Sequence, residues 1–179
     1  MKTLKIKHPK MDVQVMQPLS LSGADGPVYR ISEDKVAKFG WANGNWESLV
    51  YAVSPVGEVV QKEYEICKAL YEKGVSVPQP YGVFRLKQPA DEAWSLGIFP
   101  TRFPAFIMEY LDGGVPNSKY LKPEAIGKVE ELVKIERDKV RDLGFITSDA
   151  MGWENTIWVP SKEKIFLIDF SRWELPKTK

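Results

Sequence analysis

Cysteine and histidine are almost absent from this chain of 179 residues: Cys67 is the single cysteine and His8 the single histidine. One cysteine cannot form a disulfide within the chain. A structural zinc site usually needs four Cys or His ligands, so such a site is close to excluded. A Ser-His-Asp or Cys-His catalytic site would need His8, which lies in the basic segment of residues 5–10. A surface histidine is the simpler interpretation.

Net charge and long apolar runs are lacking as well. The chain has 25 Lys and Arg residues against 24 Asp and Glu residues, which gives a net charge of +1. This balance argues against a dedicated binder of nucleic acid or of a membrane surface. No run of 18 apolar residues occurs, and residues 1–5 have no hydrophobic signal core. We therefore expect no nucleic-acid partner, no membrane partner and, with a single thiol, a cytoplasmic protein.

Apolar residues are plentiful, at 44% of the chain with 12% aromatic, so a folded core is expected. The length allows one good core or two small lobes. The apolar pattern predicts strands, a helix, strands, a second helix and a hairpin. The predicted elements are a hairpin over 28–39 around a turn at 32–34, a helix over 59–73, strands over 81–86 and 103–110, a helix over 123–143, and a hairpin over 156–168. This order indicates an α+β protein with an antiparallel N-terminal sheet.

Each predicted helix has an apolar face and is ended by a glycine. The faces comprise Val59, Glu63, Ile66 and Leu70 in the first helix, and Ile126, Val129, Val133, Val140 and Leu143 in the second. Gly74 and Gly144 follow the two helices. Glu63 is unusual because it is a carboxylate on an inward-facing stripe, where burial without a cationic partner is costly.

Three polar residues near the end of the chain have the spacing that phosphoryl transfer needs. Asp149 is followed six residues later by Asn155, and a hairpin separates Asn155 from Asp169 in Asp-Phe-Ser. In ATP-dependent phosphoryl transfer, one carboxylate orients the attacking hydroxyl, while an Asn and a second carboxylate hold magnesium ions on the phosphates. The hairpin is expected to bring all three residues to one edge of a small sheet.

Two earlier segments suit a nucleotide site. Gly23 and Gly26 precede the strand that begins at Val28, and such glycines let backbone approach phosphates closely. Lys38 shares a strand face with Val36, where a lysine could reach a phosphate. Taken alone, the two glycines are more typical of an ordinary turn, and the lysine is more typical of a surface residue on a hairpin.

Together these segments and the strand 106–114, Phe-Ile-Met-Glu-Tyr-Leu-Asp-Gly-Gly, resemble the protein-kinase-like superfamily. The reduced members are the most similar: atypical kinases of the RIO-like and aminoglycoside-phosphotransferase-like kinds, and small bacterial effector kinases. The resemblance covers residues 13–173. It implies a kinase-like fold with an N-lobe at residues 1–112, made of an antiparallel sheet and one helix, and a truncated C-lobe at residues 113–179 that carries the catalytic and metal-binding hairpins.

The resemblance also implies ATP and Mg²⁺ as cofactors and assigns roles to residues. Lys38 would contact the α- and β-phosphates and pair with Glu63, and Asp149 would be the catalytic base. Met108 would lie behind the adenine. The full set of implied contacts is Gly23, Gly26, Val28, Lys38, Met108, Glu109 and Leu111 for the nucleotide, and Asn155 and Asp169 for the metal.

Departures from the family pattern leave the activity open. Asp149 and Asn155 lie six residues apart where the family has five, and Thr147 occupies the position of a family histidine. Only ten residues run from Phe170 to the end of the sequence, which is too few for a peptide-docking lobe. One interpretation is an ATP-dependent phosphotransferase that acts on a hydroxyl of an unidentified protein or small molecule. The alternatives are a nucleotide-binding pseudokinase that serves as an interaction module, and an unrelated α+β domain with chance matches.

Overall fold

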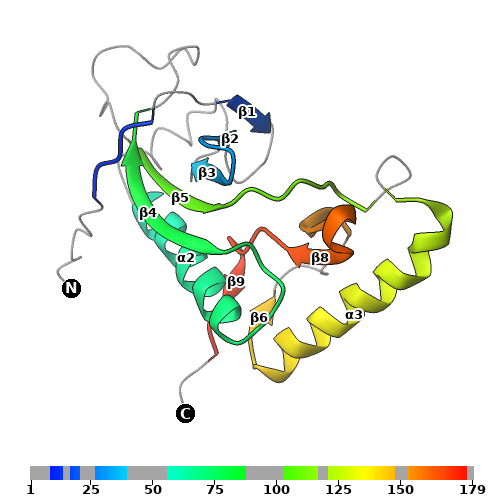
Figure 1. Cartoon of the computed structure of the whole chain (residues 1–179). Helices are drawn as coiled ribbons and strands as arrows, with labels where there is room; N and C mark the ends of the chain where they lie inside the picture. Colours follow the sequence, from blue (N-terminus) through cyan, green and yellow to red (C-terminus); the bar gives the residue numbers. More distant parts are fainter. Residues whose placement is uncertain are drawn as a thin grey trace, which may run out of the picture. The chain divides into compact units, whose positions relative to one another are not determined.

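The computed structural model describes residues 9–13, 17–20, 27–39, 56–87, 103–116, 121–147 and 153–176 (Figure 1). The chain divides into two compact units. Unit 1 comprises Met1–Tyr64 and Tyr81–Tyr110, and unit 2 comprises Glu65–Pro80 and Leu111–Lys179. Unit 2 thus includes residues 65–80, which the sequence placed in the first lobe. The lobe boundary at residue 112 stays a prediction.

Unit 1 is built on a five-stranded sheet in the order β1-β2-β3-β5-β4. Its strands are β1 (Gln17–Ser20), β2 (Val28–Arg30), β3 (Lys35–Phe39), β4 (Pro80–Leu86) and β5 (Phe103–Glu109). The pairs β1–β2, β2–β3 and β3–β5 are antiparallel. The sequence predicted four of these strands within one residue at each end. The central position of β3 gives both of its edges a neighbour, which fixes the register of its side chains.

The turn between β2 and β3 is held by Asp34. The Ser32 hydroxyl donates a hydrogen bond of 2.8 Å to Asp34 Oδ1, and Lys35 Nζ lies 2.6 Å from Asp34 Oδ2. The hydrogen bond from Lys35 lowers the pKa of the Asp34 carboxyl, and the bond from Ser32 lowers it further. An Asp side chain that closes a tight turn in this way is typical of hairpin connections.

One face of the sheet carries the core of unit 1. Its buried members are Tyr29, Ala37, Phe39, Leu86, Ala105 and Ile107. The rings of Tyr29 and Phe39 meet edge to face at 5.7 Å between centroids. Met11 and Val13 pack against this cluster from the N-terminal segment. Full burial of a large apolar side chain such as Phe39 or Ile107 contributes roughly 1.5–3 kcal/mol to stability.

The helix α2 (Val56–Glu72) buries a stripe at a spacing of three and four residues. Its buried members are Val60, Glu63, Ile66, Cys67 and Leu70. The sequence placed Val59 on this face, but Val59 is 37% exposed and Val60 is 1% exposed. The stripe 60-63-67-70 continues along one side of the helix, and position 59 lies about 100° away from position 60. The prediction for Val59 is therefore wrong by one position.

Gly74 ends α2 as predicted. It has a φ of +74°, a left-handed conformation that glycine adopts without steric cost. Its N–H group donates to the Tyr71 carbonyl, and the Val75 N–H group donates to the Leu70 carbonyl at 3.1 Å. These bonds satisfy carbonyl groups that the end of the helix would otherwise leave without a partner.

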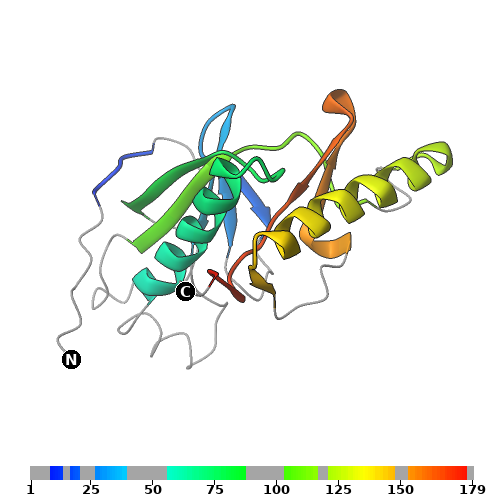
Figure 2. The same cartoon turned by 90° about the horizontal axis from the view of Figure 1, so that it is seen from below.

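Unit 2 contains a long helix and two small two-stranded sheets. Its elements are η1 (Pro123–Ala125), α3 (Ile126–Asp142), β6 (Ile146–Thr147), η2 (Trp153–Asn155), β7 (Thr156–Val159), η3 (Pro160–Lys162), β8 (Lys164–Leu167) and β9 (Trp173–Glu174). β6 pairs with β9, and β7 pairs with β8. The helix α3 packs against β8, as Figure 2 shows. The predicted second helix and the C-terminal hairpin are both confirmed.

The buried stripe of α3 consists of Val129, Val133, Glu136 and Val140. The sequence placed Ile126 on this stripe, yet Ile126 is the first residue of the helix and is 42% exposed. It precedes the buried stripe by one turn. Glu136 is the carboxylate on this stripe, and the sequence did not single it out.

Glu136 ties α3 to the segment that follows α2. Its carboxylate accepts hydrogen bonds from the Ser76 N–H group at 2.9 Å, from the Ser76 hydroxyl at 3.0 Å and from Lys139 Nζ at 2.8 Å. The Ser76 carbonyl in turn accepts the Leu167 N–H group of β8 at 2.8 Å. Nearby, the Cys67 thiol lies 3.4 Å from the Pro78 carbonyl oxygen. The segment between α2 and β4 is therefore part of the packed interior of unit 2.

Within the described ranges, no helix is both long enough and apolar enough to span a bilayer.

Candidate active site

Lys38 lies on β3, the central strand of the sheet, opposite Val28 of β2 and Phe106 of β5. Its side chain is on the face opposite the core cluster, because Ala37 and Phe39 contribute to that cluster and side chains alternate along a strand. Lys38 Nζ donates a hydrogen bond of 2.7 Å to Glu63 Oε1. The predicted pairing of Lys38 with Glu63 is confirmed.

Both members of this ion pair are shielded from water. The side chains of Lys38 and Glu63 are 9% and 5% exposed. Glu63 reaches Lys38 from α2, and the neighbouring Tyr64 ring packs edge to face on Phe106 at 5.8 Å. Removing two charges from water is costly, and their attraction repays that cost only with good geometry. A buried ion pair is therefore unusual on a sheet face, where two apolar side chains would pack equally well.

The predicted nucleotide contacts Val28 and Met108 share the face of Lys38. Val28 is directly opposite Lys38, and Met108 is opposite Val36. Residues directly opposite each other in an antiparallel pair point to the same side of the sheet. Side chains from three neighbouring strands, β2, β3 and β5, therefore lie on one surface together with Glu63.

The segment after β5 carries the other predicted adenine contacts. Glu109 is the last residue of β5 and lies opposite Lys35. Leu111 is 7% exposed and packs with Val159 and Phe166 in unit 2. Its carbonyl accepts the Gly113 N–H group at 2.9 Å. The boundary between the two units falls between Tyr110 and Leu111.

The Asp-Gly-Gly sequence after Leu111 has a structural reason. A Cβ atom at Gly113 would overlap the Trp158 carbonyl oxygen. Gly114 and Trp158 exchange two backbone hydrogen bonds, at 3.1 Å and 2.8 Å. Only glycine lets the chain approach β7 this closely.

The predicted metal ligands Asn155 and Asp169 lie at the same end of the β7–β8 hairpin. The ladder pairs Thr156 with Leu167, and the Ile168 N–H group donates to the Asn155 carbonyl at 3.0 Å. Asn155 therefore directly precedes β7 and accepts this bond, and Asp169 follows its donor, Ile168. The expectation that the hairpin brings these two residues to one edge is confirmed.

Asp169 has an unusual backbone conformation. Its φ is +65°, in the left-handed region that residues other than glycine seldom adopt. The Ser171 hydroxyl donates to Asp169 Oδ1 at 3.2 Å, and the following Phe170 is buried against Trp173 at 5.1 Å between ring centroids. Residues held in such conformations cluster at functional sites.

The side-chain oxygens of Asn155 and Asp169 are suitable ligands for a magnesium ion. Among the residues that the structure describes, no group of three or more His, Cys, Asp or Glu side chains could hold a metal by itself. Magnesium prefers oxygen ligands and is often held by one or two carboxylates together with substrate phosphates. The Asp169 carboxylate and the Asn155 amide oxygen match that pattern.

Three predicted site residues, Gly23, Gly26 and Asp149, lie outside the described residues. Thr147 is on β6, where it pairs with Trp173 of β9. Sequence reasoning missed Glu136, although the signal was available: it is a carboxylate on an apolar helix stripe, as Glu63 is.

No protein-family model matches the sequence, and no curated protein matches it. A solved structure does: the crystal structure of a Stt7 homolog from Micromonas algae, soaked with ATP, has a TM-score of 0.62 at 14% sequence identity. The alignment covers 96% of this chain and 56% of that chain. The fold is protein-kinase-like.

A second kinase structure also matches. The Lpg2603 kinase of Legionella pneumophila, bound to IP6, has a TM-score of 0.48 at 19% identity, and the alignment covers 89% of this chain and 50% of that one. The chain thus spans about half the length of the solved structures it matches. The predicted α+β fold with an antiparallel N-lobe sheet is confirmed.

Proposed function

We propose that this chain is an ATP-dependent phosphotransferase, which transfers the γ-phosphoryl group of ATP to a hydroxyl of a protein or a small molecule. The observation that carries the proposal is the buried 2.7 Å ion pair between Lys38 and Glu63. Kinases need such a Lys–Glu pair in place for phosphoryl transfer. A buried ion pair does little for stability compared with apolar residues of similar size, so a functional role accounts for it better.

In this proposal the residues have separate tasks. Lys38 contacts the α- and β-phosphates, and Asn155 and Asp169 hold Mg²⁺. The metal, when bound, neutralises charge that develops on the transferring group. Asp149 orients the acceptor hydroxyl. The remaining contacts are Gly23, Gly26 and Val28 over the phosphates, with Met108, Glu109 and Leu111 near the adenine. The ATP in the crystals of the Stt7 homolog supports ATP as the nucleotide.

Thermal unfolding with ATP and Mg²⁺ tests the binding step. At a free ligand concentration of one hundred times the dissociation constant, the fold should gain about 2.7 kcal/mol. The same titration with EDTA in place of Mg²⁺ should give a smaller gain. Incubation with ATP labelled at the γ-phosphate then tests transfer, with the chain itself and added hydroxyl compounds as acceptors. No shift with millimolar ATP and Mg²⁺ would contradict the proposal.

A nucleotide-binding pseudokinase is the alternative. It is favoured by the six-residue separation of Asp149 and Asn155 and by Thr147 at the position of the family histidine. It predicts nucleotide-dependent stabilisation with neither hydrolysis nor transfer. The proposal further includes the absence of nucleic-acid and membrane partners, which the charge balance supports, and a cytoplasmic location, which the single cysteine supports.

A further inference from the structure

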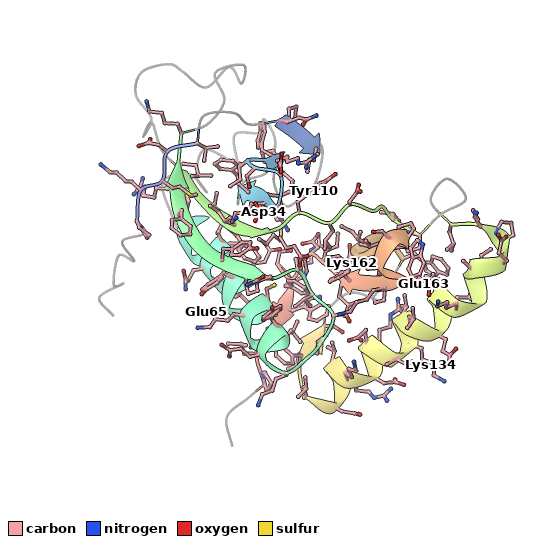
Figure 3. All side chains as sticks on the ribbon, viewed as in Figure 1. Asp34, Glu65, Tyr110, Lys134, Lys162 and Glu163 are labelled. Atoms are coloured by element: carbon pink, nitrogen blue, oxygen red, sulfur yellow. The ribbon has the colours of Figure 1, made fainter. Side chains whose placement is uncertain are left out.

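The turn between β2 and β3 contacts the segment that leaves β5. The Tyr110 N–H group donates a hydrogen bond of 2.8 Å to the Asp34 carbonyl, and Figure 3 labels both residues. This N–H group shares one rigid peptide plane with the Glu109 carbonyl. The peptide is trans, so the Glu109 carbonyl points away from Asp34. The bond to the turn therefore fixes the orientation of a backbone group that is a proposed adenine contact.

A second contact joins the same turn to the Tyr110 side chain. The Arg30 guanidinium lies over the Tyr110 ring, with its central carbon 4.1 Å from the ring centroid. A guanidinium is attracted to an aromatic face by the ring quadrupole and packs flat against it. Tyr110 is therefore held through its backbone by Asp34 and through its side chain by Arg30.

Arg30 is itself fixed by the turn. Its Nε atom donates a hydrogen bond of 3.1 Å to the Ser32 carbonyl, and a terminal nitrogen donates one of 2.9 Å to the Glu33 carbonyl. A free arginine side chain samples many rotamers, and ordering it has an entropic cost. The two hydrogen bonds to the turn offset that cost and hold the guanidinium in place against Tyr110.

Arg30 lies on the sheet face that carries the proposed nucleotide contacts. It is two residues after Val28 on β2, so both side chains point to the same face. It is also directly opposite Val36, which shares its face with Lys38. The contact between Arg30 and Tyr110 is therefore on the nucleotide face, where β5 ends.

We propose that Arg30 is a positioning residue for recognition of the base at the nucleotide site. The inference rests on the proposed function, because it takes Glu109 to be an adenine contact. A backbone carbonyl accepts a hydrogen bond from the 6-amino group of adenine and repels the 6-carbonyl oxygen of guanine. Arg30 holds Tyr110, and the shared peptide plane holds that carbonyl in place before the base arrives.

This arrangement separates the base from the phosphates. When only a fraction of the molecules has the binding segment in place, the apparent affinity falls by that fraction. Loss of Arg30 should therefore weaken the nucleotide whose base the carbonyl recognises. A nucleotide held by its phosphates alone should be affected little. Arg30 thus sets the preference for adenine over guanine.

The ratio of the dissociation constants for GTP and ATP tests the proposal. It is measured by calorimetry on the full chain with Mg²⁺, and the parent chain should prefer ATP. Arg30→Met removes the guanidinium and should lower the ratio by about fivefold, which corresponds to about 1 kcal/mol. The change should come from weaker binding of ATP. A general loss of stability would alter both constants alike, so the ratio distinguishes positioning from a merely structural role.

Further variants define the contact. Tyr110→Leu removes the ring and should lower the ratio as Arg30→Met does, whereas Tyr110→Phe keeps the ring and should behave like the parent chain. The double variant of Arg30→Met and Tyr110→Leu should show no further loss, because both changes remove the same contact. Arg30→Lys keeps the charge but not the planar fork and should retain part of the preference.

Arg141→Met is the matched control. Arg141 is an exposed arginine of α3 that pairs with its neighbours Asp138 and Asp142, so this variant removes the same charge and should keep the parental ratio.

Hydrogen exchange of the Tyr110 amide is a second readout and needs no ligand. In Arg30→Met this amide should exchange faster, because the segment that carries it is held less firmly. The amides within the ladder of β3 and β5 should keep their parental protection.

Several results would overturn the proposal. They are a parental ratio in Arg30→Met, equal losses for ATP and GTP, additive losses in the double variant, and unchanged exchange of the Tyr110 amide in Arg30→Met. A parent chain that bound ATP and GTP equally would also overturn it, while nucleotide binding would stand. A parent chain that bound neither nucleotide would contradict the proposed function itself.

Discussion

Lys38 and Glu63 allow stability to be separated from function. Each single change, Lys38→Met or Glu63→Leu, leaves one buried charge without its partner and should destabilise the fold by about 3–5 kcal/mol. The double variant removes both charges and should recover most of that loss. Urea unfolding of the parent chain, the two single variants and the double variant measures the effect.

The double variant also tests the role of the pair. It should fold and yet show no stabilisation by ATP and Mg²⁺, because Lys38 is the proposed phosphate contact. A double variant that is still stabilised by nucleotide to the parental extent would show that Lys38 is not part of the binding site.

Two carboxylates at the proposed site should respond differently to the same substitution. Asp149→Asn should abolish phosphoryl transfer and spare nucleotide affinity, since in the proposed mechanism this side chain contacts the nucleophile and not the nucleotide. Asp169→Asn should weaken metal-dependent binding and transfer together, because the lost charge acts in the ground state and in the transition state. Labelled-ATP transfer and thermal shift, run in parallel on both variants, separate the two effects.

Asparagine is the suitable replacement at Asp169 for a backbone reason. Asn tolerates the left-handed conformation that Asp169 adopts at φ +65°, so the variant isolates the loss of the charge. If Asp149→Asn transferred phosphate at the parental rate, the extra residue before Asn155 would have displaced the loop from its family role. The pseudokinase interpretation would then be the better one.

At the scale of elements, the contact between α3 and the segment after α2 depends on Glu136. Glu136→Ala leaves the buried Ser76 N–H group without its acceptor and should destabilise the chain by about 1–3 kcal/mol. Lys139→Ala removes the exposed partner of the same carboxylate and should cost less than about 1 kcal/mol. Denaturant unfolding of both variants provides the comparison. Equal losses would contradict the assignment of Ser76 as the main partner.

Sequence periodicity was sufficient to place both helices and the C-terminal hairpin. Gly74 and Gly144 stop α2 and α3 because both have positive φ, which sequence can anticipate from residue type. The identity of the buried face was harder to predict. Val59 and Val60 are equally apolar, so only packing decides which of them is inside.

The site was predictable where a charge interrupted an apolar pattern. Glu63 on its helix stripe indicated a cationic partner, and Lys38 is that partner at 2.7 Å. The same reasoning would have found Glu136. A pocket beside α3 could not be predicted, because α3 and Trp153 line it together only through the fold and their spacing carries no motif.

At the scale of the whole molecule, the kinase-like fold is present in a chain about half as long as its structural matches. The five-stranded sheet and α2 supply the Lys–Glu pair, and the β7–β8 hairpin supplies the candidate metal ligands. Fold recognition from sequence relied on the order of several weak motifs. No single motif would have been sufficient, since each also occurs as an ordinary turn, strand or amphipathic helix.

Because Cys67 is buried, the rate at which a thiol reagent modifies it measures how often the structure around α2 opens. Cys67 is the only sulfhydryl in the sequence, is fully buried and lies on α2. A thiol reagent can therefore modify only this atom, and only in molecules in which the surroundings of α2 have opened. If that opening costs about 4 kcal/mol, modification should be about 1,000-fold slower than in the urea-unfolded chain. Modification at the unfolded rate would contradict the burial of Cys67, whereas further slowing by ATP and Mg²⁺ would show, without any mutation, that the nucleotide holds α2 in place.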